Sequence, residues 1–362
     1  MQQGINKSQG AVTPEEIAAL EKEVAQLEGT YRSKIDLAEM VGQEKNKEDG
    51  PTFLSPSGIK EVKRNKDHVV KSGIVQLDKQ IRGFNLGELS VWSGSNGSGK
   101  SSLLSQLALE SINNNYNVAL FSGELVAHRV LSWVQLQASG ISHNKQTEYD
   151  NYYIVPDSVK QKINKWLEGR FYVYNNDKGS SVEKVIASID ECIVKNKIKV
   201  VIIDNLMALN LSRVVGEKYE RQTNLVIALS GLAKKHNVHI HFVAHPRKSL
   251  GFLRKEDISG TADITNLADN VFIIHRVNND FKRGIKDFLG KAGDHLTHCD
   301  NVIEVAKNRD LGISDSFISL YFEVESKRFL NYEKEKRIYE WEKDKDGFAK
   351  VSKEQYADLP FM

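Results

Sequence analysis

Between an apolar run and a helical pattern, the chain carries a glycine-rich octapeptide that leaves little choice of fold. Residues 94–101 read Gly-Ser-Asn-Gly-Ser-Gly-Lys-Ser and match the pattern G-x-x-x-x-G-K-[ST]. They follow the strand-like run at residues 89–93 and open a helical stretch at about residues 100–113. Glycines let backbone N–H groups wrap around a phosphate, and the helix N-terminus adds a positive dipole. The octapeptide therefore predicts a phosphate-binding loop at the carboxyl end of a strand.

Side chains of this loop have predictable roles. We expect Lys100 to reach the β- and γ-phosphate oxygens and the Ser101 hydroxyl to bind Mg²⁺. A glycine-rich turn is the alternative, but the fixed positions match by chance in roughly one chain of this size in a hundred. The predicted nucleotide-binding residues are Gly94, Ser95, Asn96, Gly97, Ser98, Gly99, Lys100, Ser101 and Ser102.

From about residue 72 onward, short β-rich apolar runs alternate with helical stretches. This alternation predicts an α/β fold in which helices cover both faces of a mostly parallel central sheet. The strand candidates are residues 89–93, 118–122, 171–174, 199–204, 238–244, 271–275 and 302–306. The helix candidates are about 100–113, 126–138, 158–168, 181–195 and 217–235. Residues 316–341 predict a closing antiparallel hairpin around Glu325-Ser326-Lys327, followed by a charged, solvated tail.

The N-terminal part has a different composition. Thr13-Pro14-Glu15-Glu16 is typical of a capping box with proline at the first helical position, and apolar residues at helical spacing follow. A helix at about residues 13–31 is therefore predicted, either as an arm or packed on its own domain. The glycines and prolines after it indicate a linker. We divide the chain into an N-terminal arm (1–70), an ATPase domain (71–335) and a charged tail (336–362).

The composition is that of an ordinary globular protein, with 40% apolar and 27% charged residues among 362. No apolar run approaches the ~20 residues of a membrane span, and the first residues lack a secretory layout, so we expect neither export nor membrane insertion. Two cysteines, Cys192 and Cys299, fit a reducing compartment. We expect the cytoplasm of a bacterial or phage-infected cell, with the mitochondrial matrix as the alternative. The net charge of +2 requires any basic surface for nucleic acid to be local.

Two carboxylates are predicted to complete the phosphate site. The run at residues 199–204 ends in Asp204, which could hold Mg²⁺ through water. Asn205 follows it, where many phosphate-loop ATPases have the glutamate that activates water. Glu124, just past the end of another strand, could orient or deprotonate the attacking water instead. The alternative for Glu124 is a first-turn glutamate that stabilises a helix N-terminus.

Several ordered blocks together resemble the hexameric DnaB-type replicative helicases of the RecA-fold superfamily, most closely the Twinkle-like and phage primase-helicase branch. The resemblance covers about residues 68–332. It implies a RecA-like phosphate-loop ATPase core preceded by a helical N-terminal arm. Besides the phosphate loop, the blocks are residues 72–78, 83, 87–89, 121–124, 243–248, 259–261, 268–270, 306–309 and 312.

This resemblance implies further catalytic residues. His245 is similar to the polar residue that ends a strand and senses the γ-phosphate, and a structural histidine is the alternative. Lys307 and Arg309 resemble the finger motif that reaches the nucleotide of a neighbouring subunit and neutralises charge on the transferred phosphoryl group. Two solvated basic residues are the alternative. Arg276 resembles the position that stacks on the nucleotide base, with Tyr321 or Phe322 opposite.

Nucleic acid is expected at two loops that face the central channel of a ring. Basic side chains and backbone N–H groups would follow the phosphate backbone with little sequence specificity. Solvated charge runs are the ordinary alternative. The first loop offers Arg213, Lys218 and Arg221. The second loop offers Lys248, Arg254, Lys255, Ser259, Gly260 and Thr261.

Residues 280–300 look like an insertion relative to this family. His295, His298 and Cys299 are three potential metal ligands without a fourth nearby, so we interpret the segment as a plain loop. His239 and His241 lie on one face of a predicted strand, and we interpret both as structural.

Together these patterns predict an ATP-dependent, ring-shaped DNA helicase. We expect a homo-oligomer of six that uses ATP, or another NTP or dNTP, with Mg²⁺. It would translocate on single-stranded DNA, 5′ to 3′ by the resemblance, and unwind replication forks, with a separate primase or loader as a possible partner. Two alternatives stay open: a RecA-like recombination ATPase that forms open filaments, and a loading or assembly factor that hydrolyses ATP without translocating.

Overall fold

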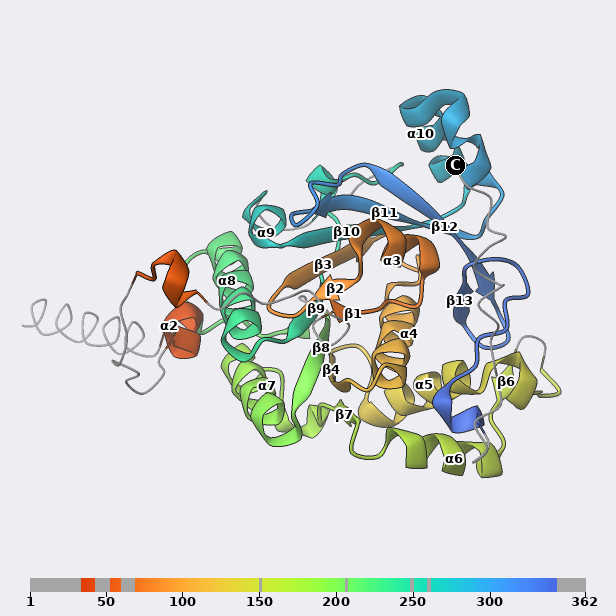
Figure 1. The fold of residues 1–362 in the computed structure, drawn as a ribbon, viewed down its shortest axis with the longest axis horizontal. Coiled ribbons are helices and arrows are strands. Elements are labelled where there is room, and N and C mark those ends of the chain that lie inside the picture. The colour runs from red at the N-terminus through yellow and green to blue at the C-terminus, as the bar shows by residue number, and fades with distance from the viewer. Residues whose placement is uncertain are drawn as a thin grey trace, which may run out of the picture.

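A mixed sheet with the strand order β13-β12-β11-β10-β3-β9-β8-β4-β7 organises the molecule (Figure 1). The computed structural model describes residues 34–42, 53–59, 69–149, 152–205, 208–247, 251–258 and 262–343. From β10 to β7 neighbouring strands are parallel, whereas β11, β12 and β13 continue the sheet antiparallel. The strands are β3 (Leu89–Gly94), β4 (Asn117–Ser122), β7 (Phe171–Val173), β8 (Ile198–Asp204), β9 (His239–Val243), β10 (Asn270–Arg276), β11 (Asn301–Asn308), β12 (Ser316–Glu323) and β13 (Arg328–Leu330).

Helices cover both faces of this sheet. α2, α7 and α8 lie on one face, and α4, α5 and α6 lie on the other (Figure 1). The main helices are α2 (Leu37–Gly42), α3 (Val75–Ile81), α4 (Lys100–Asn113), α5 (Ala127–His143), α6 (Asp157–Leu167), α7 (Val182–Asn196), α8 (Lys218–His236), α9 (Ala262–Leu267) and α10 (Asn279–Leu289). Short elements are η1 (Pro56–Gly58), β1 (Val69–Val70), β2 (Phe84–Asn85), β5 (Lys145–Gln146), β6 (Tyr153–Ile154), η3 (Asn176–Lys178), η5 (Lys255–Asp257), η6 (Gly290–Thr297) and η7 (Glu340–Glu342).

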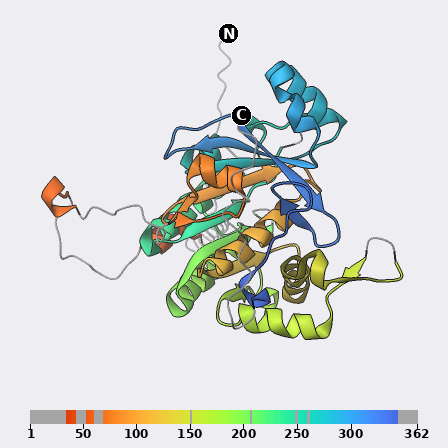
Figure 2. The same cartoon turned by 45° about the vertical axis from the view of Figure 1, so that its right-hand side comes forward.

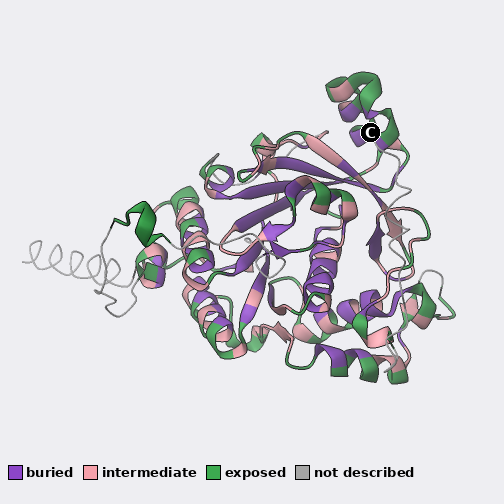
Figure 3. Ribbon diagram, viewed as in Figure 1, coloured by how far each residue is buried: buried purple, intermediate pink, exposed green. Residues whose placement is uncertain are grey.

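Alternation along the central strands explains the two layers. In β8, Val201 and Ile203 join the core beneath α7 and α8, whereas Val200 and Ile202 join the core beneath α4. Successive strand residues point to opposite faces, so a continuous apolar run is buried on both sides. Figure 3 shows the central strands buried along their length and the outer faces of the helices exposed. The β5–β6 hairpin, α10 and the exposed turn η1 project from this body (Figure 2).

The α/β fold predicted from the sequence, with its mostly parallel central sheet, is confirmed. Each strand candidate from residue 89 to residue 306 and each helix candidate corresponds to an observed element, with ends shifted by a few residues. The closing antiparallel hairpin is β12–β13. The predicted helix at 13–31, Lys248, residues 259–261 and the chain beyond residue 343 lie outside the described residues.

One segment that we expected to be linker is helical. Asp36 accepts hydrogen bonds from the backbone N–H groups of Ala38 and Glu39, at 2.9 and 3.1 Å, and so caps α2. Leu37 and Val41, one helical turn apart, are buried in the core beneath α8. The linker interpretation is therefore wrong for residues 34–42, because the nearby glycines and prolines obscured a short capped helix.

The solvated tail also begins later than residue 336. Tyr339 is fully buried and stacks on Trp166, with ring centroids 5.6 Å apart. Arg337 is buried too, and its Nη1 lies 2.5 Å from a Glu110 carboxylate oxygen. A run of charged residues predicts a solvated segment, but Arg337 is neutralised by the buried Glu110, which lets the segment pack on α4 and α6.

The segment 280–300 is not a plain loop. It forms α10 and the 3₁₀ helix η6, and Asn278 caps α10 by accepting a hydrogen bond from Phe281 N at 2.9 Å. Phe281, Ile285 and Leu296 build a small core over β11. Within the described ranges, no three His, Cys, Asp or Glu side chains gather in a way that could hold a metal ion. No helix among these residues has the length and apolar character needed to cross a membrane.

His239 and His241 are core residues, as we interpreted them. The His239 Nδ1 donates to Asn85 O at 2.6 Å, and its Nε2 lies 2.9 Å from Ser90 Oγ. Trp92 Nε1 donates to His241 Nδ1 at 3.1 Å. Burial lowers the pKa of His239 to about 4 and lowers the pKa of His241 well below its ordinary value. Both rings are therefore neutral in the folded protein near neutral pH.

These buried rings predict acid-sensitive stability. Unfolded His239 takes up a proton near pH 6.5, whereas the folded residue does so only near pH 4. The contribution of His239 to the free energy of unfolding should therefore be constant above pH 6.5 and decrease as the pH falls toward 4. The decrease from this residue is at most about 3 kcal/mol. Urea unfolding across this range measures the effect. His239→Gln should show a smaller fall than the wild type, and an equal fall would contradict the assignment.

Candidate active site

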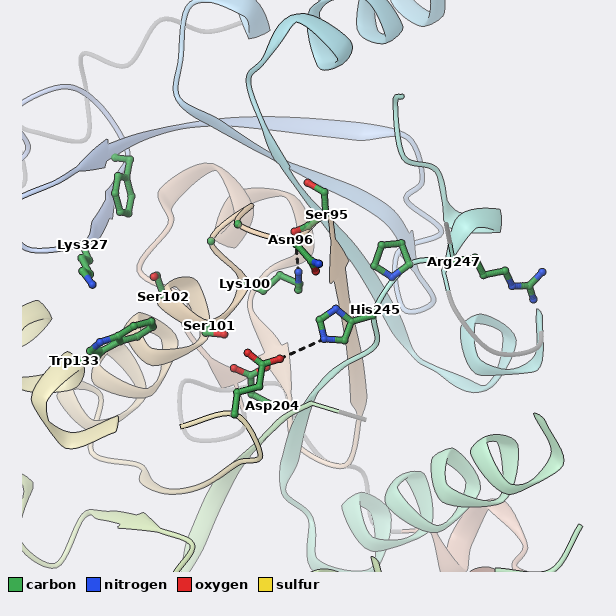
Figure 4. A pocket seen from close by; sticks show the side chains of 15 residues that line it. Ser95, Asn96, Lys100, Ser101, Ser102, Trp133, Asp204, His245, Arg247 and Lys327 are labelled. Carbon is green, nitrogen blue, oxygen red and sulfur yellow. Dashed lines mark hydrogen bonds and ion pairs between the residues drawn. The ribbon is translucent and has the colours of Figure 1, made fainter. Parts of the chain in front are cut away.

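A cavity of about 920 Å³ opens at the carboxyl ends of β3, β4, β8 and β9. Figure 4 shows Lys100, Ser101, Asp204 and His245, from three different strand ends, directed into it. Polar side chains meet here because parallel strands end at one edge of the sheet. Of the predicted phosphate-loop residues, those that line the cavity are Ser95, Asn96, Gly97, Gly99, Lys100, Ser101 and Ser102.

The phosphate loop turns tightly from β3 into α4. Gly99 has φ +96°, and a Cβ there would lie 2.5 Å from the Phe329 ring, so the position requires glycine. Ser98 N donates to Ser95 O at 3.1 Å within the turn, and Ser98 itself is buried. Lys100 Nζ donates to the carbonyls of Gly94 and Ser95 at 2.8 and 2.9 Å. Burial lowers the pKa of Lys100, although the carboxylates of Asp204 and Glu124 oppose this.

Asp204 and Ser101 form an oxygen-rich corner of the cavity. The Ser101 side chain hydrogen bonds to the Asp204 carboxylate, and Asp204 is 8% exposed. Burial raises the pKa of Asp204, and the charge of Lys100 lowers it. A hydroxyl and a carboxylate beside a phosphate loop are hard oxygen donors of the kind that Mg²⁺ prefers. The residues present therefore fit a magnesium ion.

Glu124 also lines the cavity, and it precedes α5, which begins at Ala127. It is not in the first turn of that helix, so the helix-stabilising interpretation does not fit. Asn205 Nδ2 donates to its carboxylate, and His245 Nε2 lies 3.7 Å from Glu124 Oε1. Burial, together with the charge of Lys100, lowers the pKa of His245 and favours its neutral ring. Asn205 stands where many phosphate-loop ATPases have a glutamate, and its side chain orients Glu124, the glutamate predicted to act on the water.

Some cavity residues were missed by the sequence reasoning. Trp133 of α5 and Lys327 of the β12–β13 turn form one wall, with Lys327 Nζ 4.4 Å from the Trp133 ring centroid (Figure 4). Arg247 lies at the opposite end, two residues after His245. Trp133 belongs to an amphipathic helix and Lys327 to a turn, so neither carries a local signal. Arg247 stood within a recognised block and could have been named.

The two aromatic candidates for the base site are separated by strand alternation. Phe322 lines the cavity, and its ring centroid lies 5.2 Å from that of Phe329. Tyr321 points to the opposite face of β12 and packs on the small core under α10. Arg276 is exposed at the end of β10 and is not among the described residues that line this cavity.

Lys307 and Arg309 lie at the other edge of the sheet. β11 runs antiparallel to β10, so Lys307 pairs with Val271, whereas the phosphate-loop end of β3 pairs with Ile274. Lys307 Nζ donates to the carbonyls of Thr265, Asn266 and Ala268, each at 2.8 Å, at the end of α9. Arg309 Nη1 lies 2.7 Å from Asp269 Oδ1. Neither side chain lines the cavity of its own chain within the described residues.

The first candidate DNA loop surrounds the start of α8. Arg213 is exposed and pairs with Glu183 at 3.1 Å. Lys218 is the exposed first residue of α8, and Arg221 Nε donates to Gly216 O at 2.5 Å.

Arg254 and Lys255 differ in their surroundings. Arg254 contacts Asp315 and Glu304, and its guanidinium lies 4.0 Å from the Phe288 ring centroid. These contacts compete with the DNA-binding role expected for Arg254. Lys255 begins η5 and is only partly buried.

Comparisons with known proteins support the same fold. Two solved structures, one of an ATPase domain and one named "The Structure Of A DnaB-Like Replicative Helicase And Its Interactions With Primase", each align with a TM-score of 0.57 and 17% identity. The first alignment covers 73% of this chain and 91% of the other, and the second covers 72% and 63%. At this identity the likeness concerns the fold.

A curated relative and a family model extend the comparison. The "Twinkle homolog protein, chloroplastic/mitochondrial" of Arabidopsis thaliana is 28% identical over 217 residues, which are 56% of this chain and 30% of that protein. The family model "DnaB-like helicase C terminal domain" matches residues 69–331, which include the phosphate loop, Glu124, Asp204, His245 and the end of β11. This chain therefore belongs to the DnaB-like helicase C-terminal domain family.

Proposed function

We propose that this protein is an ATP-dependent DNA helicase that assembles as a ring of six, moves 5′ to 3′ on single-stranded DNA and unwinds replication forks. The observation that carries the proposal is the division of the predicted catalytic residues between two opposite edges of the sheet. Lys100, Ser101, Asp204 and Glu124 meet at one edge, and Lys307 and Arg309 lie at the other. A site assembled from both groups requires two chains.

The charged and polar residues predicted to act in the cavity each have a proposed part in hydrolysis. Ser101 and Asp204 would hold Mg²⁺, which supplies charge neutralisation on the phosphates when bound. Lys100 would bind the β- and γ-phosphates once they replace its carbonyl partners. Glu124, oriented by Asn205, would accept the proton of the attacking water. His245, 3.7 Å from the same carboxylate, would sense whether the γ-phosphate is present.

Lys307 and Arg309 are proposed to act on the nucleotide of a neighbouring subunit. The strand register gives the distance between Lys307 and the phosphate loop. Val271 pairs with both Lys307 and Val91, and the phosphate loop begins at Gly94, three residues after Val91. Three strand residues span about 10 Å, and the two groups diverge further beyond the strand ends. An arginine that reaches a phosphoryl group from the adjacent subunit lowers the barrier because it stabilises charge that develops in the transition state.

The proposed DNA contacts lie in the two predicted loops, without Arg254, whose contacts with Glu304 and Asp315 compete with this role. Arg213, Lys218 and Arg221 form the first, and Lys248, Lys255 and residues 259–261 belong to the second. Their basic side chains and backbone N–H groups suit phosphate contacts rather than base reading. A separate primase or loader is a proposed partner. Cytoplasm of a bacterial or phage-infected cell is the proposed location, with an organelle as the alternative suggested by the name of the Arabidopsis relative.

The function can be tested by unwinding of a forked DNA duplex with ATP and Mg²⁺. Wild-type protein should separate the strands when a 5′ single-stranded tail is present. Glu124→Gln should lower ATP turnover about a hundredfold or more and abolish unwinding, with nucleotide binding retained, because the proton acceptor is lost. Glu168→Gln, an exposed glutamate at the end of α6, is the matched control and should behave as wild type.

Other outcomes separate the alternatives. Turnover that DNA does not stimulate, without unwinding, would indicate a loading or assembly factor. Open filaments on single strands in electron micrographs would indicate a recombination ATPase. Unwinding that needs a 3′ tail would overturn the proposed direction alone.

The two-chain site predicts complementation between defective subunits. Lys100→Ala and Arg309→Ala should each lose about a thousandfold in ATP turnover. When the two variants are mixed in equal amounts, intact sites form wherever an Arg309→Ala subunit receives the finger of a Lys100→Ala subunit. About a quarter of the interfaces in a randomly mixed ring meet this condition, so turnover should recover toward a quarter of wild type. Absence of recovery in assembled rings would contradict the shared site.

The base site is tested by neighbouring aromatic residues on opposite faces of β12. Phe322→Ala should weaken nucleotide affinity roughly three- to tenfold through loss of a stacking surface. Tyr321→Ala should leave the affinity unchanged and lower the melting temperature, since Tyr321 packs under α10. Titration with a fluorescent nucleotide measures the first effect and thermal unfolding the second. Equal affinities for both variants would exclude Phe322 from the base site.

A further inference from the structure

Residues 251–258 form a segment that is attached to the chain directly after His245. Pro246 forms an antiparallel bridge with Ile258, and Arg247 N donates to Asp257 O at 2.6 Å. Arg247 itself lines the nucleotide cavity. Any displacement of the chain after His245 therefore reaches this segment through main-chain hydrogen bonds.

On its other side, the segment is attached to β11 by a buried ion pair. Arg254 Nη1 lies 3.5 Å from Glu304 Oε1, and Arg254 also contacts Asp315. Glu304 is fully buried, and its second oxygen lies 2.9 Å from His275 Nε2. Among the described residues, neither Arg254 Nη1 nor Glu304 Oε1 has a hydrogen-bond partner. A carboxylate buried this completely is costly unless a cation faces it, so Glu304 favours the inward position of Arg254.

Helix α10 covers this ion pair. The Arg254 guanidinium lies 4.0 Å from the Phe288 ring centroid, and Phe252 stacks on His275 with centroids 5.0 Å apart. A Cβ at Gly284 would lie 2.0 Å from the Phe252 Cβ, so this glycine lets α10 approach the segment. The Phe288 ring reduces the contact of the Arg254 guanidinium with water and so strengthens the attraction between the guanidinium and Glu304.

β11 also holds the chain that follows residues 259–261. Three and five positions after Glu304, Lys307 binds the last carbonyls of α9 and Arg309 binds Asp269. Basic side chains at a helix C-terminus satisfy its free carbonyl groups. The strand that ends in the proposed finger thus contacts the chain both before and after residues 259–261.

We propose that Arg254 is a positioning residue and not a DNA contact, and that its ion pair with Glu304 makes residues 251–258 and β11 move as one unit. We call this ion pair the brace. Through it, a change of the nucleotide that is sensed at His245 and a change at the finger of β11 would both reach residues 251–258. This inference rests on the proposed function, and it revises the DNA-binding role expected for Arg254.

Salt dependence of DNA binding separates the two roles of Arg254. A residue that contacts phosphate contributes about 0.7 to the slope of log affinity against log salt for single strands. Arg254→Ala should leave this slope unchanged but lower the ratio of DNA-stimulated to basal ATP turnover about fivefold or more. Lys255→Ala, the adjacent basic residue, should lower the slope. Arg283→Ala, an exposed arginine of α10 paired with Asp280, should change neither quantity.

A conservative substitution adds a second criterion. Arg254→Lys keeps the charge but not the planar fork that faces Glu304 and stacks on Phe288. It should therefore fail to restore the turnover ratio. A reduced slope in Arg254→Ala that Arg254→Lys restores would overturn the proposal in favour of a phosphate contact. An unchanged slope with an unchanged ratio would also overturn it.

Removal of Arg254 alone leaves the buried Glu304 carboxylate with His275 as its partner but without its arginine, which can unfold the chain. The double variant Arg254→Met, Glu304→Gln removes both charges at similar volume and should fold while still lacking the brace. Hydrogen exchange of the full chain, without nucleotide or DNA, then reports on the brace itself. Amides of residues 251–258 should exchange at least about tenfold faster than in wild type, with α7 unchanged.

The exchange measurement also separates this inference from the proposed function. If wild-type turnover is not stimulated by DNA, the proposed function and the coupling both fail, and exchange still decides whether the ion pair holds the segment. Unchanged exchange in the double variant would overturn the brace whatever the enzyme assays show.

Discussion

Parallel pairing of β3 with β9 on one side and with β10 on the other is the constraint on which the site depends. It brings the phosphate loop to the same edge as the residues that follow β4, β8 and β9. Polar groups at these strand ends then share one cavity although they are far apart in the sequence. β11 reverses direction beside β10, so its last residues emerge at the other edge. A single sheet thus carries the cavity at one edge and the pair Lys307 and Arg309, the proposed finger, at the other.

Buried charge gives the cavity its chemical character. Burial lowers the pKa of Lys100 and raises the pKa of Asp204. The charge of each residue partly offsets the effect of burial on the pKa of the other. His245 is held toward its neutral form by burial and by the charge of Lys100. Glu124 is the most exposed of the group and is oriented by Asn205. Such mutual dependence means that a phosphate or a magnesium ion entering the cavity would change the balance for every member.

The opposite edge is organised by β11. Glu304 in its middle faces Arg254, and Lys307 near its end holds the carbonyls of α9. The same strand therefore contacts the chain on both sides of residues 259–261, which belong to the second proposed DNA loop. α10 and η6 pack on this region and shield the Arg254–Glu304 pair. α10, the Arg254–Glu304 ion pair and β11 therefore pack together in one region of the sheet.

Local patterns determined much of this molecule. The octapeptide at residues 94–101, the apolar run ending in Asp204 and the alternation of strands with helices each depend on neighbours in the chain, and the elements predicted from them exist. Short or charged segments escaped prediction, since α2 and the packing of Tyr339 depend on partners from distant positions. Trp133 and Lys327 became cavity residues only through the folding of β12 and β13 against α5. Tertiary structure alone decided between Tyr321 and Phe322, and it alone turned Arg254 toward Glu304, because strand register and burial are properties of the assembled sheet and not of any one segment.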